Sequence, residues 1–442
     1  MSELKTIWGE ALDPNAVLQE YPRPQMVRAS YINLNGCWDY AITEGRMKPR
    51  EWDGRILVPF SPEAPLSGVN RSLQPWQTLW YRRTLDVSPR VGFRLLLHFG
   101  AVDQMAAVYV NDVLTAEHTG GYTAFSVDIT QRLKDTDNVL TVAVLDGTDT
   151  NELSRGKQRT KRGGIWYTPQ SGIWQTVWME WVPDAYISAL HITPDIQRGC
   201  ARITVCSEKD VPCRIGFQGR SIDGMTNHEL TVAVDEPELW SPESPKLYSF
   251  YAVLGSDRVE SYFALRSVAA GVDAGGVPCL MLNGKPYYHS GVLDQGYWPD
   301  GLYTAPSDEA LIYDISLMKS MGFNMLRKHI KIEPLRWYYH CDRLGMLVWQ
   351  DMINGGGSYD PITISAPLIT RRHRSDHDYK RFARTDEFGR AQYYRELEEM
   401  IRQLYNCPCI VMWVPFNEGW GQFDAAEAVH RIVALDTTRT ID

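Results

Sequence analysis

The chain has 442 residues, of which 44% are apolar and 22% are charged, and its formal net charge is −9. This length exceeds what one hydrophobic core organises, so we expect two or three domains. The acidic balance, with no Lys/Arg cluster interleaved with aromatic residues, argues against nucleic acid as a partner.

The sequence predicts neither a secretory signal nor a membrane-spanning segment. The first fifteen residues lack the cationic and apolar regions of a secretory signal, and the longest apolar run, 410–416, is too short for a bilayer span. The eight cysteines are scattered, and Cys407-Pro-Cys409 matches neither a redox motif nor a zinc pair. We therefore expect free thiols and a cytoplasmic location, or a periplasmic or secreted one if a signal peptide was removed. No metal and no cofactor are expected.

Residues 1–182 show short alternating or apolar runs separated by turn residues, which is the spacing of a β-sandwich. The alternating run 108–110 leads into Asn111-Asp112, which predicts a hairpin turn. Helical periodicity is nearly absent here. We predict an all-β domain over 1–182.

Pro183-Asp184 interrupts the chain, and a second set of short strands follows. Their number and spacing are typical of a smaller sandwich of the immunoglobulin type, which we place at residues 183–272. Leu239-Trp240-Ser241-Pro242 predicts a turn inside this domain.

From residue 273 strands and helices alternate. Ser307, followed by two acidic residues, predicts a helix over 308–321. The strands MLVWQ at 346–350 and IVMWVPF at 410–416 are apolar along their whole length, as parallel strands buried on both faces must be. A (β/α)₈ TIM barrel over 273–442, of which about the first half is present, is the first choice, and an open doubly wound sheet is the second. No glycine-rich phosphate turn follows these strands, which argues against a nucleotide-binding sheet.

A parallel barrel carries its active site at the carboxyl ends of its strands, so the candidate site residues are the polar residues at which apolar strands end. The polar residues at these positions are His289, Asp294, Arg327, Lys328, His329, Gln350, Asp351, Asn417 and Glu418. Trp298, Trp349 and Trp420 lie close to them in sequence and offer the aromatic faces on which a pyranose ring stacks.

Each candidate also has a purely structural interpretation. Glu418 directly follows the most apolar strand, which favours catalysis over the role of a helix-start acid. Asp351 suits a structural pair with Arg327 as well as a substrate contact. His289 fits a core histidine, whereas His329 fits substrate binding. The three tryptophans could belong to the core, although their position after strands favours the wall of a site.

The segment 352–389 is predicted to be a long loop before a helix that starts at Ala391. Loops of this length in compact domains usually carry function. We expect it to act as a lid or to form part of a substrate subsite.

Several segments follow one another in an order that is more specific than any of them alone. They are NLNGCWDY at 33–40, LWYRRTLDV at 79–87, HFGAVDQMAAVYVND at 98–112, SGIWQTVWME at 171–180, ELWSPESPKLY at 238–248, LNGKPYYHSGV at 282–292, MKSMGFNMLRKHIKIEP at 318–334 and WYYHCDRLGMLVWQDM at 337–352. In this order they resemble glycoside hydrolase family 2, the family of β-galactosidases, β-glucuronidases and β-mannosidases.

The resemblance implies a sugar-binding jelly-roll domain, an immunoglobulin-like sandwich and a TIM barrel. It also implies that Glu418, in Phe-Asn-Glu-Gly-Trp, is the general acid/base and that Asn417 binds the 2-hydroxyl of the sugar. Arg327 and His329 match positions that orient the carboxylates and the sugar. Val-Pro-Phe before Asn417, and a spacing of His329 to Arg327 that is one residue shorter than in typical β-galactosidases, leave the identity of the sugar open.

These features predict a retaining, exo-acting β-glycoside hydrolase that resembles β-galactosidases, with β-glucuronidase and β-mannosidase as alternatives. The competing class is a non-catalytic carbohydrate-binding protein with an incomplete barrel, against which the intact Asn417-Glu418 pair argues. An esterase would need a G-x-S-x-G turn, and the sequence has none. The expected partner is a glycoside or oligosaccharide, and a homo-oligomer is compatible with the sequence.

The second carboxylate of a retaining mechanism, the nucleophile, is implied by the resemblance to lie on a later barrel strand. Counted from Tyr287, the fourth strand ends at Phe416, and Thr440-Ile441 only begin a fifth. We therefore expect that the nucleophile is not in this chain and that the 442 residues alone do not hydrolyse glycosides. A fragment of a longer enzyme, a truncated chain and a barrel completed by another chain remain open alternatives.

Overall fold

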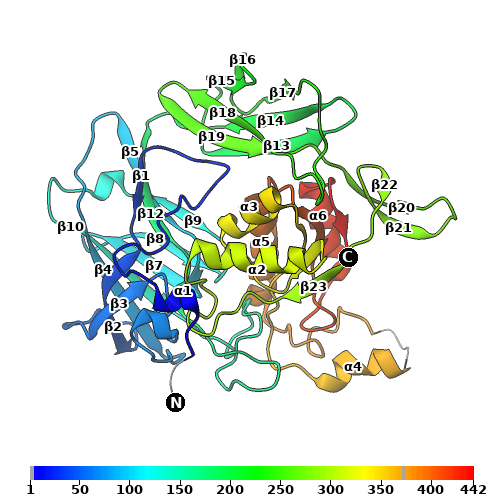
Figure 1. The fold of residues 1–442 in the computed structure, drawn as a ribbon. Helices are drawn as coiled ribbons and strands as arrows, with labels where there is room; N and C mark the ends of the chain where they lie inside the picture. The colour runs from blue at the N-terminus through cyan, green and yellow to red at the C-terminus, as the bar shows by residue number, and fades with distance from the viewer. Residues whose placement is uncertain (1–3, 371–373) are drawn as a thin grey trace.

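The structure is a computed structural model that describes residues 4–370 and 374–442. Figure 1 shows three regions: a β-sandwich near the N-terminus, a smaller sandwich at the top of the view, and a parallel sheet covered by helices that runs to the C-terminus. The predicted order of a jelly-roll sandwich, an immunoglobulin-like sandwich and part of a TIM barrel is confirmed. Among the described residues, no helix is long and apolar enough to cross a membrane.

The first region is built almost entirely of antiparallel strands. Its elements are α1 (Ile7–Glu10), β1 (Tyr31–Asn33), β2 (Gly36–Glu44), β3 (Gly54–Val58), η1 (Pro65–Ser67), β4 (Gln77–Leu85), β5 (Phe93–Phe99), β6 (Val102–Asp103), β7 (Met105–Val110), β8 (Val113–Thr119), β9 (Phe125–Asp128), η2 (Thr130–Arg132), β10 (Asn138–Leu145), β11 (Gly172–Ile173) and β12 (Val177–Pro183).

A four-stranded sheet, β1-β12-β5-β9, faces a six-stranded sheet, β3-β2-β4-β10-β7-β8. Leu95 and Leu97 of one sheet and Val108 and Val142 of the other are fully buried in a shared core. The turn predicted at Asn111-Asp112 joins β7 to β8, and both residues have positive φ angles of 52° and 66°, as a tight hairpin turn requires.

The second region is a sandwich of seven strands. They are β13 (Ala189–Asp195), β14 (Cys200–Cys206), β15 (Pro212–Phe217), β16 (Arg220–Met225), β17 (Glu229–Ala233), β18 (Tyr248–Leu254) and β19 (Asp257–Phe263). The sheet β13-β14-β17 packs against β16-β15-β18-β19. A small sheet of β20 (Val268–Val272), β21 (Pro278–Leu282) and β22 (Lys285–Pro286) follows, and the predicted boundary at residue 272 falls between its paired strands β20 and β21.

The third region alternates strands and helices. Its elements are β23 (Gly291–Asp294), α2 (Asp308–Ser320), β24 (Met325–Lys328), α3 (Leu335–Leu344), β25 (Leu347–Asp351), α4 (Pro361–Thr370), α5 (Glu387–Leu404), β26 (Ile410–Val414), α6 (Ala425–Leu435) and β27 (Thr440–Ile441). The five strands are parallel and adjacent in chain order, which is the arrangement of successive strands in a TIM barrel and not of a doubly wound sheet.

Local chemistry explains where these helices begin. The Ser307 hydroxyl accepts a hydrogen bond from the backbone N–H of Ala310, so the predicted start of α2 is confirmed. The start predicted for α5 at Ala391 is wrong, because the Asp386 carboxylate caps the N–H groups of Phe388 and Gly389 and the helix begins at Glu387.

The prediction of an uninterrupted loop over 352–389 is also wrong, because α4 lies within it. Asp360 accepts hydrogen bonds from the Ile362 N–H and the Thr363 hydroxyl, and Pro361 occupies the first helical position. Proline is favoured at that position because the N–H that it lacks would have no partner inside the helix.

Charged side chains that reach across domain boundaries hold the three regions together. The Arg28 guanidinium lies 3.2 Å from Glu180 of β12 and 2.9 Å from Asp257 of β19, and all three side chains are buried. Arg266, at the end of the second sandwich, donates to the carbonyl oxygens of Pro408 and Ile410 beside β26. The first sandwich is therefore fastened to the second, and the second to the partial barrel.

Candidate active site

The strands of the partial barrel direct alternate side chains to opposite faces of the sheet. In the register of β23, β24 and β25, Arg327 pairs with Trp349, whereas Lys328 pairs with Asp294 and Gln350. Arg327 and Trp349 therefore share one face, and Lys328, Asp294 and Gln350 share the other. The sequence candidates divide into two groups on this basis.

On the first face, four predicted residues from three successive strands form one connected group, which we call the strand-end network: Arg327, His329, Asp351 and Asn417. The Arg327 Nε lies 2.9 Å from one Asp351 oxygen, and His329 Nδ1 lies 3.0 Å from the other. Arg327 also donates through a terminal nitrogen to the Asn417 side-chain oxygen, at 3.1 Å. Asp351 is completely buried, so both of its oxygens are held by cationic or polar partners away from water.

The general-acid candidate stands beside this network at the end of β26. Asn417 is buried and turns to Arg327, whereas the next side chain, Glu418, is exposed. Glu418 has a φ of 58°, in the left-handed region that residues other than glycine adopt infrequently. Its carboxylate accepts a hydrogen bond of 2.7 Å from Trp420 Nε1.

The other two tryptophans lie in different surroundings from Trp420. Trp298 is 8% exposed and packs edge-on against Trp8 at 6.1 Å, which favours the core interpretation that the sequence left open. Trp349 is partly buried on the same face as Arg327 and donates from Nε1 to His289 Nδ1 at 2.9 Å. Burial lowers the pKa of His289 to about 4, so this half-buried histidine is a neutral acceptor.

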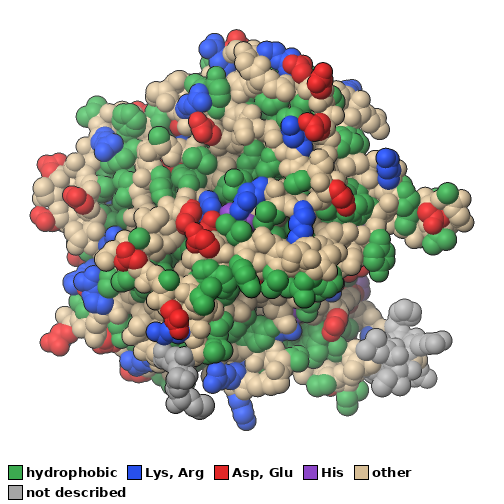
Figure 2. Space-filling model, in the orientation of Figure 1, with side chains coloured by type: hydrophobic (Ala, Val, Ile, Leu, Met, Phe, Trp, Pro, Cys, Tyr) green, Lys and Arg blue, Asp and Glu red, His purple; other side chains and the backbone are tan. Residues whose placement is uncertain are grey.

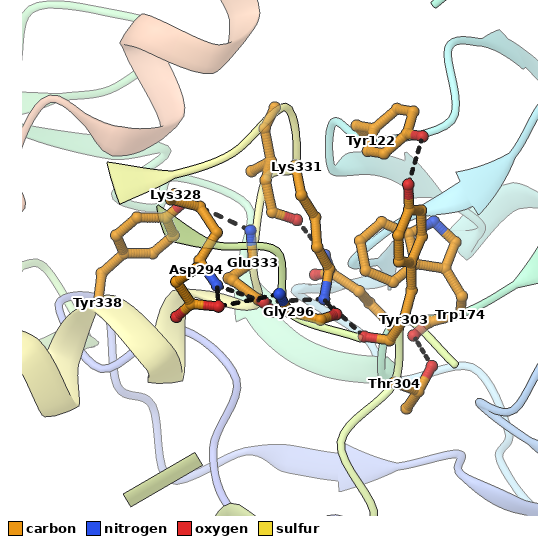
Figure 3. A network of polar contacts seen from close by, with 12 residues as sticks. Tyr122, Trp174, Asp294, Gly296, Tyr303, Thr304, Lys328, Lys331, Glu333 and Tyr338 are labelled. Atoms are coloured by element: carbon orange, nitrogen blue, oxygen red, sulfur yellow. Dashed lines mark hydrogen bonds and ion pairs between the residues drawn. The ribbon is translucent and has the colours of Figure 1, made fainter. Parts of the chain in front are cut away.

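Asp294 is not brought to the strand-end network. It pairs at 2.9 Å with Lys328 on the opposite face, and Lys328 also contacts Glu333 at 2.9 Å (Figure 3). Lys331 completes this buried set through Glu333 and through the carbonyl oxygens of Gly296 and Tyr303.

The Lys331 ammonium lies 5.5 Å from the ring of Trp174, which belongs to the first sandwich. Burial lowers the pKa of Lys331 to about 8, against the attraction of Glu333. The set that contains Asp294 therefore ties the barrel to the sandwich, and its position does not support the predicted substrate contact of Asp294.

One group of residues beside Glu418 was missed by the sequence interpretation. It is a run of cationic residues followed by Trp166 and Tyr167 in the connection between β10 and β11, which we call the basic loop, residues 155–167. Trp166 of this loop lies edge-on to Trp420 at 6.0 Å and stacks on Tyr359 at 6.1 Å. The signal was readable in the run RGKQRTKRGGIWY, but nothing in the sequence placed it next to Glu418.

A cavity of about 240 Å³ lies elsewhere, at the junction of the three regions. Its lining includes His98, Trp178 and Arg336 but no residue of the strand-end network and not Glu418. In Figure 2 charged side chains of both signs are spread over the face shown, without one dominant sign. Within residues 4–370 and 374–442, no group of three or more His, Cys, Asp or Glu side chains is arranged to hold a metal ion.

Comparison with family models places most of the chain in one group of enzymes. The galactose-binding domain-like model of glycosyl hydrolase 2 matches residues 62–175, a second model of glycosyl hydrolases family 2 matches 185–266, and the TIM barrel domain of that family matches 278–442.

Curated relatives are distant but extend over most of the chain. A β-galactosidase of Thermoanaerobacter pseudethanolicus is 24% identical over 81% of the chain, and a putative β-glucuronidase of Formosa agariphila is 26% identical over 87%. The chain spans only 47% and 44% of the length of these two proteins. Human β-glucuronidase is 23% identical over 98% of the chain, which covers 70% of it.

Solved structures share the fold. The β-D-glucuronidase of Dictyoglomus thermophilum superposes with a TM-score of 0.75 at 18% identity, covering 95% of this chain and 73% of that one. A β-galacturonidase of Eisenbergiella tayi superposes with a TM-score of 0.72 at 20% identity, covering 96% and 72%.

Proposed function

This chain belongs to glycoside hydrolase family 2, and from that premise we propose that it forms the sugar-binding and acid/base part of a retaining, exo-acting β-glycosidase. The relatives include β-galactosidases, β-glucuronidases and β-galacturonidases, and a β-galactoside is the substrate that we propose to test first. Glu418 is the proposed general acid/base.

The observation that carries the proposal is the arrangement at the end of β26. Asn417 accepts a hydrogen bond from Arg327, whereas the adjacent Glu418 is exposed to solvent and accepts a hydrogen bond from Trp420. A sugar bound over the strand-end network would meet the Asn417 amide, and its glycosidic oxygen would lie on the side of Glu418. An acid that stands on the leaving-group side of the bond is what protonation of the leaving oxygen needs.

In this mechanism Glu418 first donates its proton to the leaving oxygen and later takes one from the attacking water. A second carboxylate, about 5 to 5.5 Å away in retaining enzymes, forms the glycosyl intermediate. Asp351 is a poor candidate for it, because both of its oxygens are engaged by Arg327 and His329 in a buried position. We propose that the nucleophile comes from outside residues 1–442.

The test compares leaving groups in the enzyme that carries these residues. We expect Glu418→Gln to lower the hydrolysis of alkyl β-glycosides by about 10² to 10⁴-fold and that of dinitrophenyl β-glycosides far less, because a good leaving group needs no proton. Glu427→Gln, which removes another exposed glutamate nearby on α6, is the matched control and should change neither rate.

Equal losses on both substrate types would contradict the role of Glu418. A panel of nitrophenyl β-galactoside, β-glucuronide and β-mannoside then identifies the sugar. The 442-residue chain by itself is expected to turn over none of them, and turnover by that chain would contradict the proposed source of the nucleophile.

A further inference from the structure

The basic loop is unusual in an acidic protein. Between residues 155 and 167 it holds five cationic residues and no acidic one, in a chain with a net charge of −9. The cationic residues are Arg155, Lys157, Arg159, Lys161 and Arg162. Among the described residues, none of these five side chains has a carboxylate within ion-pair distance, whereas arginines elsewhere in the chain commonly do.

The loop is held in place by the barrel. The backbone N–H groups of Arg155 and Gly156 both donate to the carbonyl oxygen of Asn354, at 2.8 and 3.0 Å. The Arg155 side chain is 2% exposed and donates to the carbonyl oxygens of Gly356 and Gly357. Figure 1 shows the blue-green connection after β10 reaching the orange segment that leads to α4. These contacts anchor the start of the loop to the segment that follows β25.

The aromatic residues of this area connect the loop to Glu418. We call Arg159, Trp166, Tyr359 and Trp420 the rim cluster. The Arg159 guanidinium lies 3.8 Å from the Trp166 ring, Trp166 contacts Tyr359 and Trp420, and Trp420 donates to Glu418. Asn417 is hydrogen-bonded to Arg327 and is not part of this chain of contacts.

Some hydrogen-bond donors of the basic loop have no acceptor among the described residues. The Nε atoms of Arg155 and Arg159 are buried and meet no acceptor among the described residues. Lys161 and Arg162 at the tip are exposed, and the nearby carboxylate of Asp149 accepts hydrogen bonds from Thr160 of the loop. Lys157 lies close enough to Glu418 for the two charges to interact, although burial lowers the pKa of Lys157.

Resting on the proposed role of Glu418, we propose that the basic loop and the rim cluster bind the leaving-group side of an acidic oligosaccharide, in which a sugar beyond the scissile bond carries a carboxylate or a sulfate ester. The aromatic faces would stack on the sugar rings. The guanidinium and ammonium groups would pair with the anionic substituents, for which arginine has the matching geometry. Both features reach Glu418, through Trp420 and through Lys157, and the proposed function puts the leaving group next to Glu418.

Binding to the 442-residue chain tests this inference without any turnover. Isothermal titration would compare three oligosaccharides of equal length: trigalacturonate, a sulfated galactotriose and neutral galactotriose. We expect the acidic sugar whose group the loop recognises to bind about tenfold more tightly than the neutral one at low salt. The preference should shrink toward equality near about 1 M salt, because the cations at the tip are exposed.

A pair of variants assigns the preference to the loop. Lys161→Ala/Arg162→Ala should weaken binding of the preferred acidic sugar about five- to tenfold and that of the neutral sugar less than about twofold. Arg198→Ala/Lys209→Ala removes two exposed cations from the second sandwich and should leave every affinity within about twofold.

Every result of these binding experiments either supports the proposal or contradicts it. Preference for the carboxylated or for the sulfated sugar identifies the anionic group. Equal affinity for all three sugars, no binding of any, an unchanged preference in the loop variant, or an equal loss in the control variant overturns the proposal. Duplex DNA that competes as well as the acidic sugar also overturns it. If the enzyme hydrolyses neutral glycosides through Glu418 but does not bind acidic sugars more tightly than neutral ones, only this inference is contradicted. If the protein binds acidic sugars selectively but hydrolyses no glycoside, only the proposed function is contradicted.

Discussion

Two regions meet at Asn417 and Glu418, and they differ in almost every physical respect. The strand-end network is buried except for the half-buried Arg327, lies at the ends of parallel strands, and has both Asp351 oxygens engaged. The rim cluster and the basic loop lie on connections from two different domains, are largely half-exposed, and keep cationic groups without a carboxylate partner.

This difference separates two tasks of a glycosidase. Groups held on strands by neighbouring charges keep their geometry, which is what the reacting sugar needs. Groups on loops with open pairing capacity can accept different partners, which is what the leaving-group side needs. Substitutions in the network should therefore damage stability and the chemical step, whereas substitutions at the rim should alter affinity. The predictions below test that division.

The largest effect is expected for Asp351→Ala. Removing this carboxylate leaves the buried His329 and the half-buried Arg327 without their partner, and breaking a buried ion pair in this way costs about 3 to 5 kcal/mol. Urea unfolding measures the loss. Asp351→Asn keeps the shape and one acceptor and should cost clearly less. A cost below about 1 kcal/mol for both variants would show that the network is not a buried, paired unit.

A smaller effect is expected for Asn417→Ala in the enzyme that carries these residues. If Asn417 contacts the sugar more strongly in the transition state than in the ground state, kcat should fall about 10- to 100-fold, with little change in KM. Steady-state kinetics on an aryl glycoside measures both constants. A rise in KM alone would mean that Asn417 binds the ground state and the transition state equally.

At the rim, Trp166→Ala should weaken binding of an oligosaccharide by about 1 kcal/mol, which is roughly fivefold in Kd. Tryptophan fluorescence during titration measures this affinity. Trp166→Phe keeps an aromatic face and should recover most of it. If Trp166→Ala instead destabilised the chain as much as Asp351→Ala, the rim would be part of the structural core and the division would be wrong.

The smallest effect on folding is expected for Lys161→Ala/Arg162→Ala. Both side chains are exposed and have no carboxylate within ion-pair distance among the described residues, so the free energy of unfolding should change by no more than about 0.5 kcal/mol. Urea unfolding alongside the wild-type chain checks this. A larger change would show that the tip of the loop is packed against the barrel.

The sequence was most informative where local chemistry decides structure. The period-two runs of the sandwiches, the Asn111-Asp112 turn and the Ser307 cap all depend on neighbours in the chain, and the structure agrees with each. The predicted element boundaries were wrong where a second local signal competed with the periodic pattern. The Asp386 cap begins α5 ahead of the periodic stretch, and the Asp360-Pro361 start produces α4 in a polar, glycine-containing segment.

The sequence also identified residues of the candidate site, but it did not show which of them lie together in space. Strand ends identify polar residues that point toward a barrel mouth, but a strand alternates its side chains, and the face that each one occupies depends on register. Register sends Asp351 to Arg327 and Asp294 to Lys328, whereas Trp298 lies in the connection after β23 and packs in the core. The catalytic role of Glu418 and the binding roles of its neighbours remain predictions.

By itself, the sequence determined the order of the three regions, the family, and the position of Asn417-Glu418 after an apolar strand, because these depend on periodicity and on short motifs. Only the tertiary structure decided that the basic loop of the first sandwich lies beside Glu418. The loop and Glu418 are separated by about half of the chain, and what joins them is a set of backbone and aromatic contacts from Asn354 to Tyr359 that no local pattern encodes.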